Sequence, residues 1–180
     1  QHLELSRDIA QAFNRYYNLD FFPIPEPVIT GKATRVMSLK DGLKKMSKSE
    51  LSDLSRINLT DEKDQIVNKI KKAKTDTLPM PSNIEELNNR PEAKNLIGIY
   101  SSLSGITLEK SLQDFSGKNF SEFKEILTQV LIDKIIPISR EIKNLLNEKN
   151  YLIKILSEGC KKAEEISSKK IKKIHEILGF

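Results

Sequence analysis

The chain has 180 residues, of which 38% are hydrophobic and 31% are charged, and its formal net charge is +5 at pH 7. This length suffices for one domain or for parts of two, and the hydrophobic content excludes a disordered chain. The longest apolar run, residues 130–138, is interrupted by Asp133 and Lys134, so the sequence predicts no transmembrane helix and no membrane partner. The single cysteine excludes an intramolecular disulfide.

No basic region leads into an apolar stretch near the start, so we expect no secretory signal and a cytoplasmic location, with an organellar matrix as the alternative. The chain begins with Gln1, which indicates a piece of a longer protein. The positive charge permits a polyanionic partner without requiring one.

The first third is expected to mix one helix with short strands. Three prolines between residues 23 and 27 force an extended path. Residues 28–30 and 35–39 are typical of short strands, and residues 43–54 of a loop. An amphipathic helix near the start is predicted from apolar residues at helical spacing, which are Leu5, Ile9, Phe13 and Tyr16.

The next helix is expected to begin after Thr60, whose side chain can cap it, with Asp61 and Glu62 in the first turn. Pro79 and Pro81 then open a linker. These signals place a single short helix between the loop and the linker.

From Pro91 onward the sequence predicts helices almost to its end. Pro91 suits a first helical position and Gly105 a terminator, and a short helix follows Thr107. Pro137 is expected to kink or split a long helix, and a last helix covers residues 152–178. We therefore expect four or five helices in an all-helical bundle, preceded by the tail of an α/β layer.

One basic loop contains the string Lys45-Met46-Ser47-Lys48-Ser49. Mobile ammonium and hydroxyl groups can close around the negative charge of a polyphosphate, but a solvated surface loop has the same composition. Charge alone leaves both interpretations open. The wider stretch holds five cationic residues against one acid, Asp41; the cations are Arg35, Lys40, Lys44, Lys45 and Lys48.

The five-residue string resembles the signature loop of class I aminoacyl-tRNA synthetases, and its flanks resemble bacterial-type tryptophanyl-tRNA synthetases. The resemblance covers essentially the whole chain. Tyrosyl enzymes share the fold, but their version of the loop differs, so we expect tryptophan as the amino acid. The similar segments are residues 1–10, 13–14, 35–39, 95–96 and 99–105.

The resemblance implies a mainly α chain in two parts. Residues 1–80 would form the C-terminal end of a Rossmann-like α/β catalytic domain that includes the signature loop. Residues 81–180 would form a helical domain that binds the tRNA anticodon region. Six lysines between residues 161 and 173 can contact tRNA phosphates, although they can equally serve only to keep a helix soluble.

The same resemblance assigns site residues. Lys45 and Lys48 would contact the ATP phosphates as catalytic residues, and Ser47 and Ser49 would supply hydrogen bonds within the loop. Met46 and the backbone of Val36 would lie near the adenine, although Val36 taken alone is typical of an ordinary core strand. ATP would enter as its Mg²⁺ complex, and no protein-ligated metal is expected.

The implied activity is the ATP-dependent activation of L-tryptophan and its transfer to tRNA(Trp) by a homodimeric enzyme. The family's second nucleotide-binding signature and its tryptophan-binding segments are absent, so the chain resembles only the C-terminal half and is expected to be inactive alone. The alternative is a non-catalytic, synthetase-derived module that binds RNA or a protein.

Overall fold

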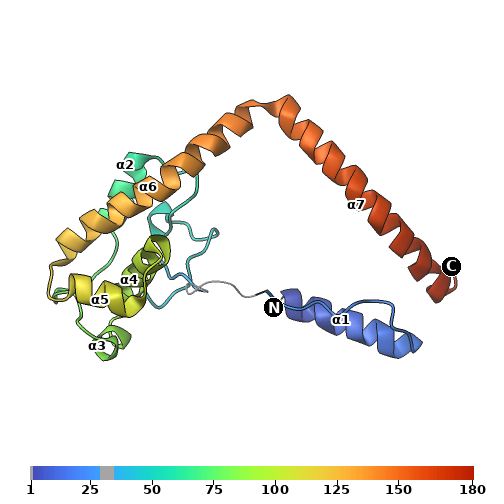
Figure 1. Ribbon diagram of the computed structural model, residues 1–180, viewed down its shortest axis with the longest axis horizontal. Helices are drawn as coiled ribbons and strands as arrows, with labels where there is room; N and C mark the ends of the chain where they lie inside the picture. Colours follow the sequence, from blue (N-terminus) through green and yellow to red (C-terminus); the bar gives the residue numbers. More distant parts are fainter. Residues whose placement is uncertain (1, 29–34) are drawn as a thin grey trace. The chain divides into compact units, whose positions relative to one another are not determined.

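A computed structural model describes residues 2–28 and 35–180, and this part of the chain is mainly helical, as predicted (Figure 1). The helices are α1 (His2–Tyr17), α2 (Lys63–Lys71), α3 (Ile84–Asn88), α4 (Pro91–Ser104), α5 (Leu108–Phe115), α6 (Phe120–Asn147) and α7 (Lys149–Leu178), with a 3₁₀ turn at Asp53–Ser55. None of these helices is long and apolar enough to cross a bilayer.

The chain divides into two compact units. Unit 1 comprises Gln1–Thr30 and Lys149–Phe180, and unit 2 comprises Gly31–Glu148. Unit 2 therefore holds both the basic loop and helices α2 to α6, whereas α7 belongs to the other unit. The expected boundary between the catalytic part and the tRNA-binding part, at residues 80 and 81, is not a boundary between these compact units. It stays a prediction.

The core of unit 2 forms where α6 packs against α2 and α4, with α5 and α3 also against α4. Phe123 of α6 and Leu96 of α4 are almost completely buried there. Tyr100, Phe115 and Phe123 join α4, α5 and α6 through edge-to-face contacts, with ring centroids 4.9 Å apart for both the Tyr100–Phe115 and Phe115–Phe123 pairs. This packing provides a fixed platform beside the basic loop.

Several predicted helix boundaries in unit 2 are confirmed. Pro91 is the first residue of α4, and Gly105 ends it in the left-handed conformation with φ +69°. The Thr107 side chain caps α5 by accepting from the Lys110 amide at 3.2 Å. Helix α6 runs without interruption through Pro137, so this proline does not split it.

Other expectations are corrected. Helix α2 begins at Lys63, and its cap is Glu62, not Thr60, because Glu62 and Gln65 form a reciprocal capping box. Helix α3 was not predicted between the prolines at 79 and 81 and Pro91. Its Asn83 cap accepts from the Glu86 amide at 2.9 Å.

The two predicted strands do not form within the described residues. Val28 has no regular structure, and residues 29 and 30 lie outside the described part. Of residues 35–39, only Met37 makes a β-bridge, an isolated antiparallel pair with Lys45. The other edge of Met37 pairs with a side chain of α4, described below, and not with a neighbouring strand.

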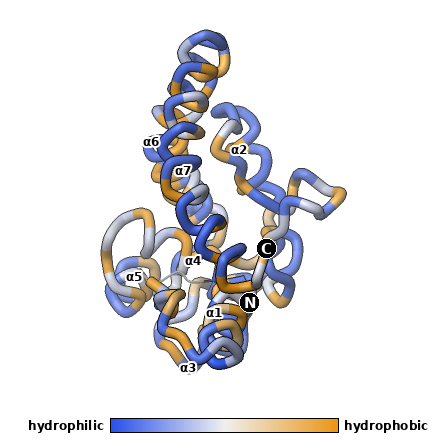
Figure 2. The backbone as a smooth tube through the Cα atoms, turned by 90° about the vertical axis from the view of Figure 1, so that its right-hand side faces the viewer, coloured by the Kyte–Doolittle hydropathy of each residue, from blue (hydrophilic) through white to orange (hydrophobic). Residues whose placement is uncertain are grey.

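Unit 1 contains α1, the segment that follows it, and α7. The chain reverses after α1 at Asn18, where φ is +52°, and the Asn14 side chain accepts from the Phe22 amide at 2.9 Å. Leu5 and Ile9 on α1 are 57% and 59% exposed, so apolar side chains of that helix are open to solvent within unit 1. No residue of α7 is buried, and polar and apolar residues mix along its length (Figure 2).

Candidate active site

A tight hairpin positions the basic loop. The Ser38 amide donates to the Lys44 carbonyl at 2.8 Å, and the Met46 amide donates to the Val36 carbonyl at 3.0 Å. Asp41 forms the turn, because its carbonyl accepts from the Lys44 amide and its carboxylate accepts from the Leu43 amide. The hairpin therefore brings the signature string back alongside Val36.

The hairpin is joined to the rest of unit 2 through its backbone. Leu39, which is 2% exposed, donates from its amide to the Ser55 carbonyl at 2.9 Å and accepts from the Lys74 amide at 2.8 Å. These bonds connect the hairpin to the 3₁₀ turn on one side and to the end of α2 on the other.

Within the loop, the apolar and charged side chains separate. Met46 is half-buried and packs against the core, whereas Lys45 and Lys48 are exposed. Neither ammonium group has a hydrogen-bond or ion-pair partner among residues 2–28 and 35–180. The Ser47 and Ser49 hydroxyls lie 2.8 Å apart, and the Ser47 oxygen also accepts from the Ser49 amide at 3.3 Å. The lysines thus remain available to a ligand on an anchored backbone.

The loop forms one wall of a cavity of about 550 Å³. Five of the six predicted site residues line it, and Ser49 is held next to it through Ser47. Two arginines that the site prediction lacked, Arg35 and Arg56, also line the cavity. The other lining residues come from the string and from residues 56–60; the full set is Arg35, Val36, Lys45, Met46, Ser47, Lys48, Arg56, Ile57, Asn58, Leu59 and Thr60.

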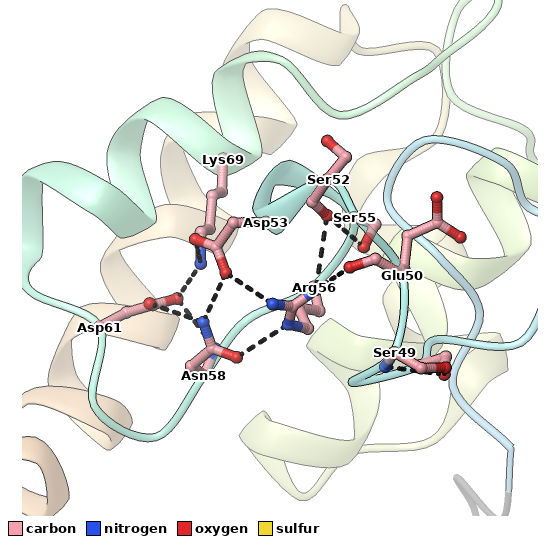
Figure 3. A network of polar contacts seen from close by, with 10 residues as sticks. Ser49, Glu50, Ser52, Asp53, Ser55, Arg56, Asn58, Asp61 and Lys69 are labelled. Carbon is pink, nitrogen blue, oxygen red and sulfur yellow. Dashed lines mark hydrogen bonds and ion pairs between the residues drawn. The ribbon is translucent and has the colours of Figure 1, made fainter.

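A buried ionic network supports the opposite wall (Figure 3). The Lys69 ammonium, 3% exposed, lies 2.7 Å from carboxylate oxygens of both Asp53 and Asp61. The Asn58 side chain donates to the same two carboxylates at 2.9 and 3.1 Å. These hydrogen bonds, from Lys69 first and then Asn58, hold the pKa of Asp53 below its usual value. Sequence reasoning missed this network because its members become neighbours only in the folded chain.

The network also fixes the Arg56 side chain. Its guanidinium contacts Asp53 at 3.1 Å, donates to the Asn58 side chain at 3.1 Å and donates to the Glu50 carbonyl at 2.9 Å. Arg56 is therefore a fixed positive charge in the wall, whereas Lys45 and Lys48 have no partner in the described part of the chain. No carboxylate lines this cavity within the described residues, so its electrostatics favour a polyanion such as a triphosphate.

A second basic surface lies on α7, where six lysines and Glu164, Glu165 and Glu176 interleave. One of the six, Lys170, has its ammonium 4.5 Å from the centroid of the Phe21 ring and 3.4 Å from the Phe21 carbonyl. Part of this lysine cluster therefore contacts its own unit.

The family model for class I tRNA synthetases specific for tryptophan and tyrosine matches residues 1–135. The chain therefore belongs to this family. It is 47% identical to the tryptophan–tRNA ligase of Caulobacter vibrioides and 48% identical to that of Rickettsia conorii, in both cases over its whole length. It spans about half the length of these relatives, namely 53% and 54%.

Solved structures agree. The tryptophanyl-tRNA synthetase of Mycoplasma pneumoniae aligns with 99% of this chain at a TM-score of 0.82 and 26% identity, and the match covers 53% of that protein. The Campylobacter jejuni tryptophanyl-tRNA synthetase, solved in complex with ADP and tryptophan, aligns with 99% of the chain at a TM-score of 0.67 and 26% identity, covering 54% of that protein.

Proposed function

We propose that the chain forms the carboxy-terminal half of a tryptophan–tRNA ligase, which activates L-tryptophan with ATP and transfers it to tRNA(Trp). The observation that carries the proposal is the pair of ammonium groups of Lys45 and Lys48, which have no partner among the described residues and lie on an anchored signature loop beside a cationic cavity. Membership of the family and the identity to tryptophan–tRNA ligases support tryptophan over other amino acids.

In the proposed activation step, the tryptophan carboxylate attacks the α-phosphorus of ATP, giving the aminoacyl adenylate and pyrophosphate. Lys45 and Lys48 neutralise the charge that develops on the pyrophosphate, so catalysis rests on positioning and electrostatics and not on a protein nucleophile. In the second step, the terminal ribose hydroxyl of the tRNA attacks the adenylate carbonyl.

The remaining residues of the loop bind the nucleotide. Ser47 and Ser49 hold the loop conformation through their paired hydroxyls, and Met46 and the Val36 backbone lie on the adenine side of the cavity. ATP enters as its Mg²⁺ complex. In that complex the phosphates of ATP would hold the ion.

The helical region, residues 81–180, is proposed to contact the anticodon region of the tRNA, with the exposed lysines of α7 as candidate phosphate contacts. By the same resemblance the complete enzyme is proposed to be a homodimer in the cytoplasm or an organellar matrix. Support for these assignments comes from the family relationship and from the charge of α7.

The experiment measures tryptophan-dependent ATP–pyrophosphate exchange with the chain extended at its amino end to the length of its relatives. Changing Lys45 or Lys48 to Ala should lower the exchange rate by about 100-fold, the scale of losing one charge-stabilising donor. Lys134→Ala, which removes an exposed lysine of α6 away from the cavity, is the matched control and should leave the rate unchanged.

Unchanged exchange in both loop variants would contradict the role of the signature lysines. An extended protein that binds tRNA but shows no exchange would instead establish the alternative, a synthetase-derived RNA-binding module.

A further inference from the structure

The side chain of Asn95, on α4, pairs with the backbone of the hairpin that carries the signature loop. Its Oδ1 accepts from the Met37 amide at 2.9 Å, and its Nδ2 donates to the Met37 carbonyl at 2.8 Å. The Nδ2 also lies 3.4 Å from the Ser38 carbonyl. Asn95 is 8% exposed, so its side chain is largely buried with both ends of its amide paired.

The pattern of the hairpin explains why this contact bears on the loop. Met37 faces Lys45 as a non-hydrogen-bonded antiparallel pair, because the bonds between the two arms lie on either side of it, from Ser38 to Lys44 and from Met46 to Val36. The amide and carbonyl of Met37 therefore point away from Lys45, and the Asn95 amide occupies the place that a neighbouring strand would take.

The turn of the same hairpin rests against the first turn of α4. A Cβ at Gly42 would lie 2.6 Å from the Pro91 carbonyl carbon and 2.6 Å from the Glu92 nitrogen, so the two backbones are in direct contact. Helix α4 thus holds the hairpin at two places, one on the arm at Met37 and one on the turn at Gly42.

We propose that Asn95 is a positioning residue for the activation step, acting through Met37 to set the position of Lys45. This inference rests on the proposed function. The Lys45 backbone faces Met37 across the hairpin, but its ammonium has no partner among residues 2–28 and 35–180, so the position of the ammonium depends on the arm that Asn95 holds. A displacement of about 1 Å in such a group is enough to cost up to about 100-fold in rate.

The test uses the chain extended to the length of its relatives and measures kcat and KM in ATP–pyrophosphate exchange. Asn95→Ala should lower kcat by about 10- to 100-fold while the KM for tryptophan stays unchanged, because the contact acts on the phosphate side of the reaction. Ser101→Ala is the matched control: Ser101 is a buried polar residue of the same helix whose hydroxyl donates to the Ile106 carbonyl at 2.7 Å and not to the hairpin backbone.

A double-mutant cycle separates positioning from a general structural role. If Asn95 acts through Lys45, the Asn95→Ala/Lys45→Ala double variant should lose about as much activity as Lys45→Ala alone. Melting temperatures of Asn95→Ala and Ser101→Ala show whether the two variants are destabilised to a similar extent. Asn95→Asp is a further variant with a side chain of nearly the same shape. It keeps the acceptor for the Met37 amide but loses the donor to the Met37 carbonyl.

The outcomes are distinguishable. Equal kcat losses in Asn95→Ala and Ser101→Ala, or additive losses in the double variant, would overturn the positioning role while leaving the proposed function intact. Full exchange in Lys45→Ala would overturn the proposed function itself. A kcat loss confined to the Asn95 variants and absent on the Lys45→Ala background would support the inference.

Discussion

Lys69 offers the sharpest test of what holds the cavity wall in place, through the change Lys69→Met. Its ammonium lies 2.7 Å from both Asp53 and Asp61, whose side chains are 52% and 4% exposed. Without the lysine, Asp53 can be rehydrated, but Asp61 remains as a buried charge, and the donors that it keeps among the described residues are the backbone and side-chain amides of Asn58. Removing one partner of a buried pair costs about 3–5 kcal/mol, and because only Asp61 is left uncompensated we expect the lower end, about 3 kcal/mol.

Urea unfolding of the chain measures this change, with the loss of helical circular dichroism as the signal. Because two compact units can unfold separately, hydrogen exchange at the buried Ile66 and Ile70 amides should report the same loss in unit 2. Lys63→Met, which replaces an exposed lysine of the same helix, is the matched control and should change stability by no more than about 0.5 kcal/mol.

A double variant tests the reasoning itself. Lys69→Met combined with Asp61→Asn removes both charges, so it should be less destabilised than Lys69→Met alone, by about 1–2 kcal/mol. If the double variant were as unstable as the single variant or less stable than it, the loss could not come from an uncompensated carboxylate, and the electrostatic account of the wall would be refuted.

Two further predictions concern the hairpin and the pH dependence. Gly42→Ala places a Cβ 2.6 Å from the backbone at Pro91 and Glu92 and should destabilise unit 2 by about 1–3 kcal/mol, whereas Gly98→Ala, with no atom within 4 Å, should stabilise α4 by about 0.5–1 kcal/mol in thermal melts. Hydrogen bonds from Lys69 and then Asn58 lower the pKa of Asp53 from its ordinary 3.8, so its stabilising effect is present above that value and disappears as the pH falls through the lower folded-state pKa. Acid titration of stability should therefore show a smaller decline in Asp53→Asn than in the unchanged chain, and equal declines would count against the network.

The predictable part of the fold is its local part. Helix α4 begins and ends where a first-position proline and a terminal glycine indicate, because both signals act through the backbone of the residue itself. The start of α2 was misplaced because Thr60, Asp61 and Glu62 all have side chains that can cap. Two contacts decide among them: Asp61 is taken by Lys69, and the local capping box with Gln65 selects Glu62.

The sequence at the start of helix α3 contains a capping signal, although the sequence analysis does not predict this helix. Ser82 and Asn83 precede Glu86, and Glu86 accepts from the Ser82 amide at 3.0 Å while Asn83 accepts from the Glu86 amide. This is a reciprocal arrangement similar to a capping box. An interpretation based only on the flanking prolines misses α3, because this helix has only five residues.

The candidate site likewise has a part that the sequence predicts and a part that it does not. The signature string predicts the loop residues by itself, since their order in the chain carries the motif. Arg56 and Asn58 in the wall have no such signal, and Asn95 lies in a segment that resembles the family but does not indicate its contact with the hairpin. The side-chain oxygen of Asn95 accepts a hydrogen bond from the amide of Met37, which is 58 residues away in the sequence. Nothing in the sequence around either residue indicates this contact.

Composition left two interpretations of the loop open, and the packing of Met46 bears on the choice between them. A loop that is merely solvated has no reason to bury its central residue, whereas here Met46 packs against the core and its amide is bonded to Val36. The packing of Met46 fixes the backbone between two exposed lysines. The conformational entropy of this backbone is therefore already lost when the chain folds, and binding a ligand does not cost it again. An anchored backbone, with ammonium groups on either side that have no partner among the described residues, suits the polyphosphate binding that we propose, because the charges are not neutralised by this part of the chain.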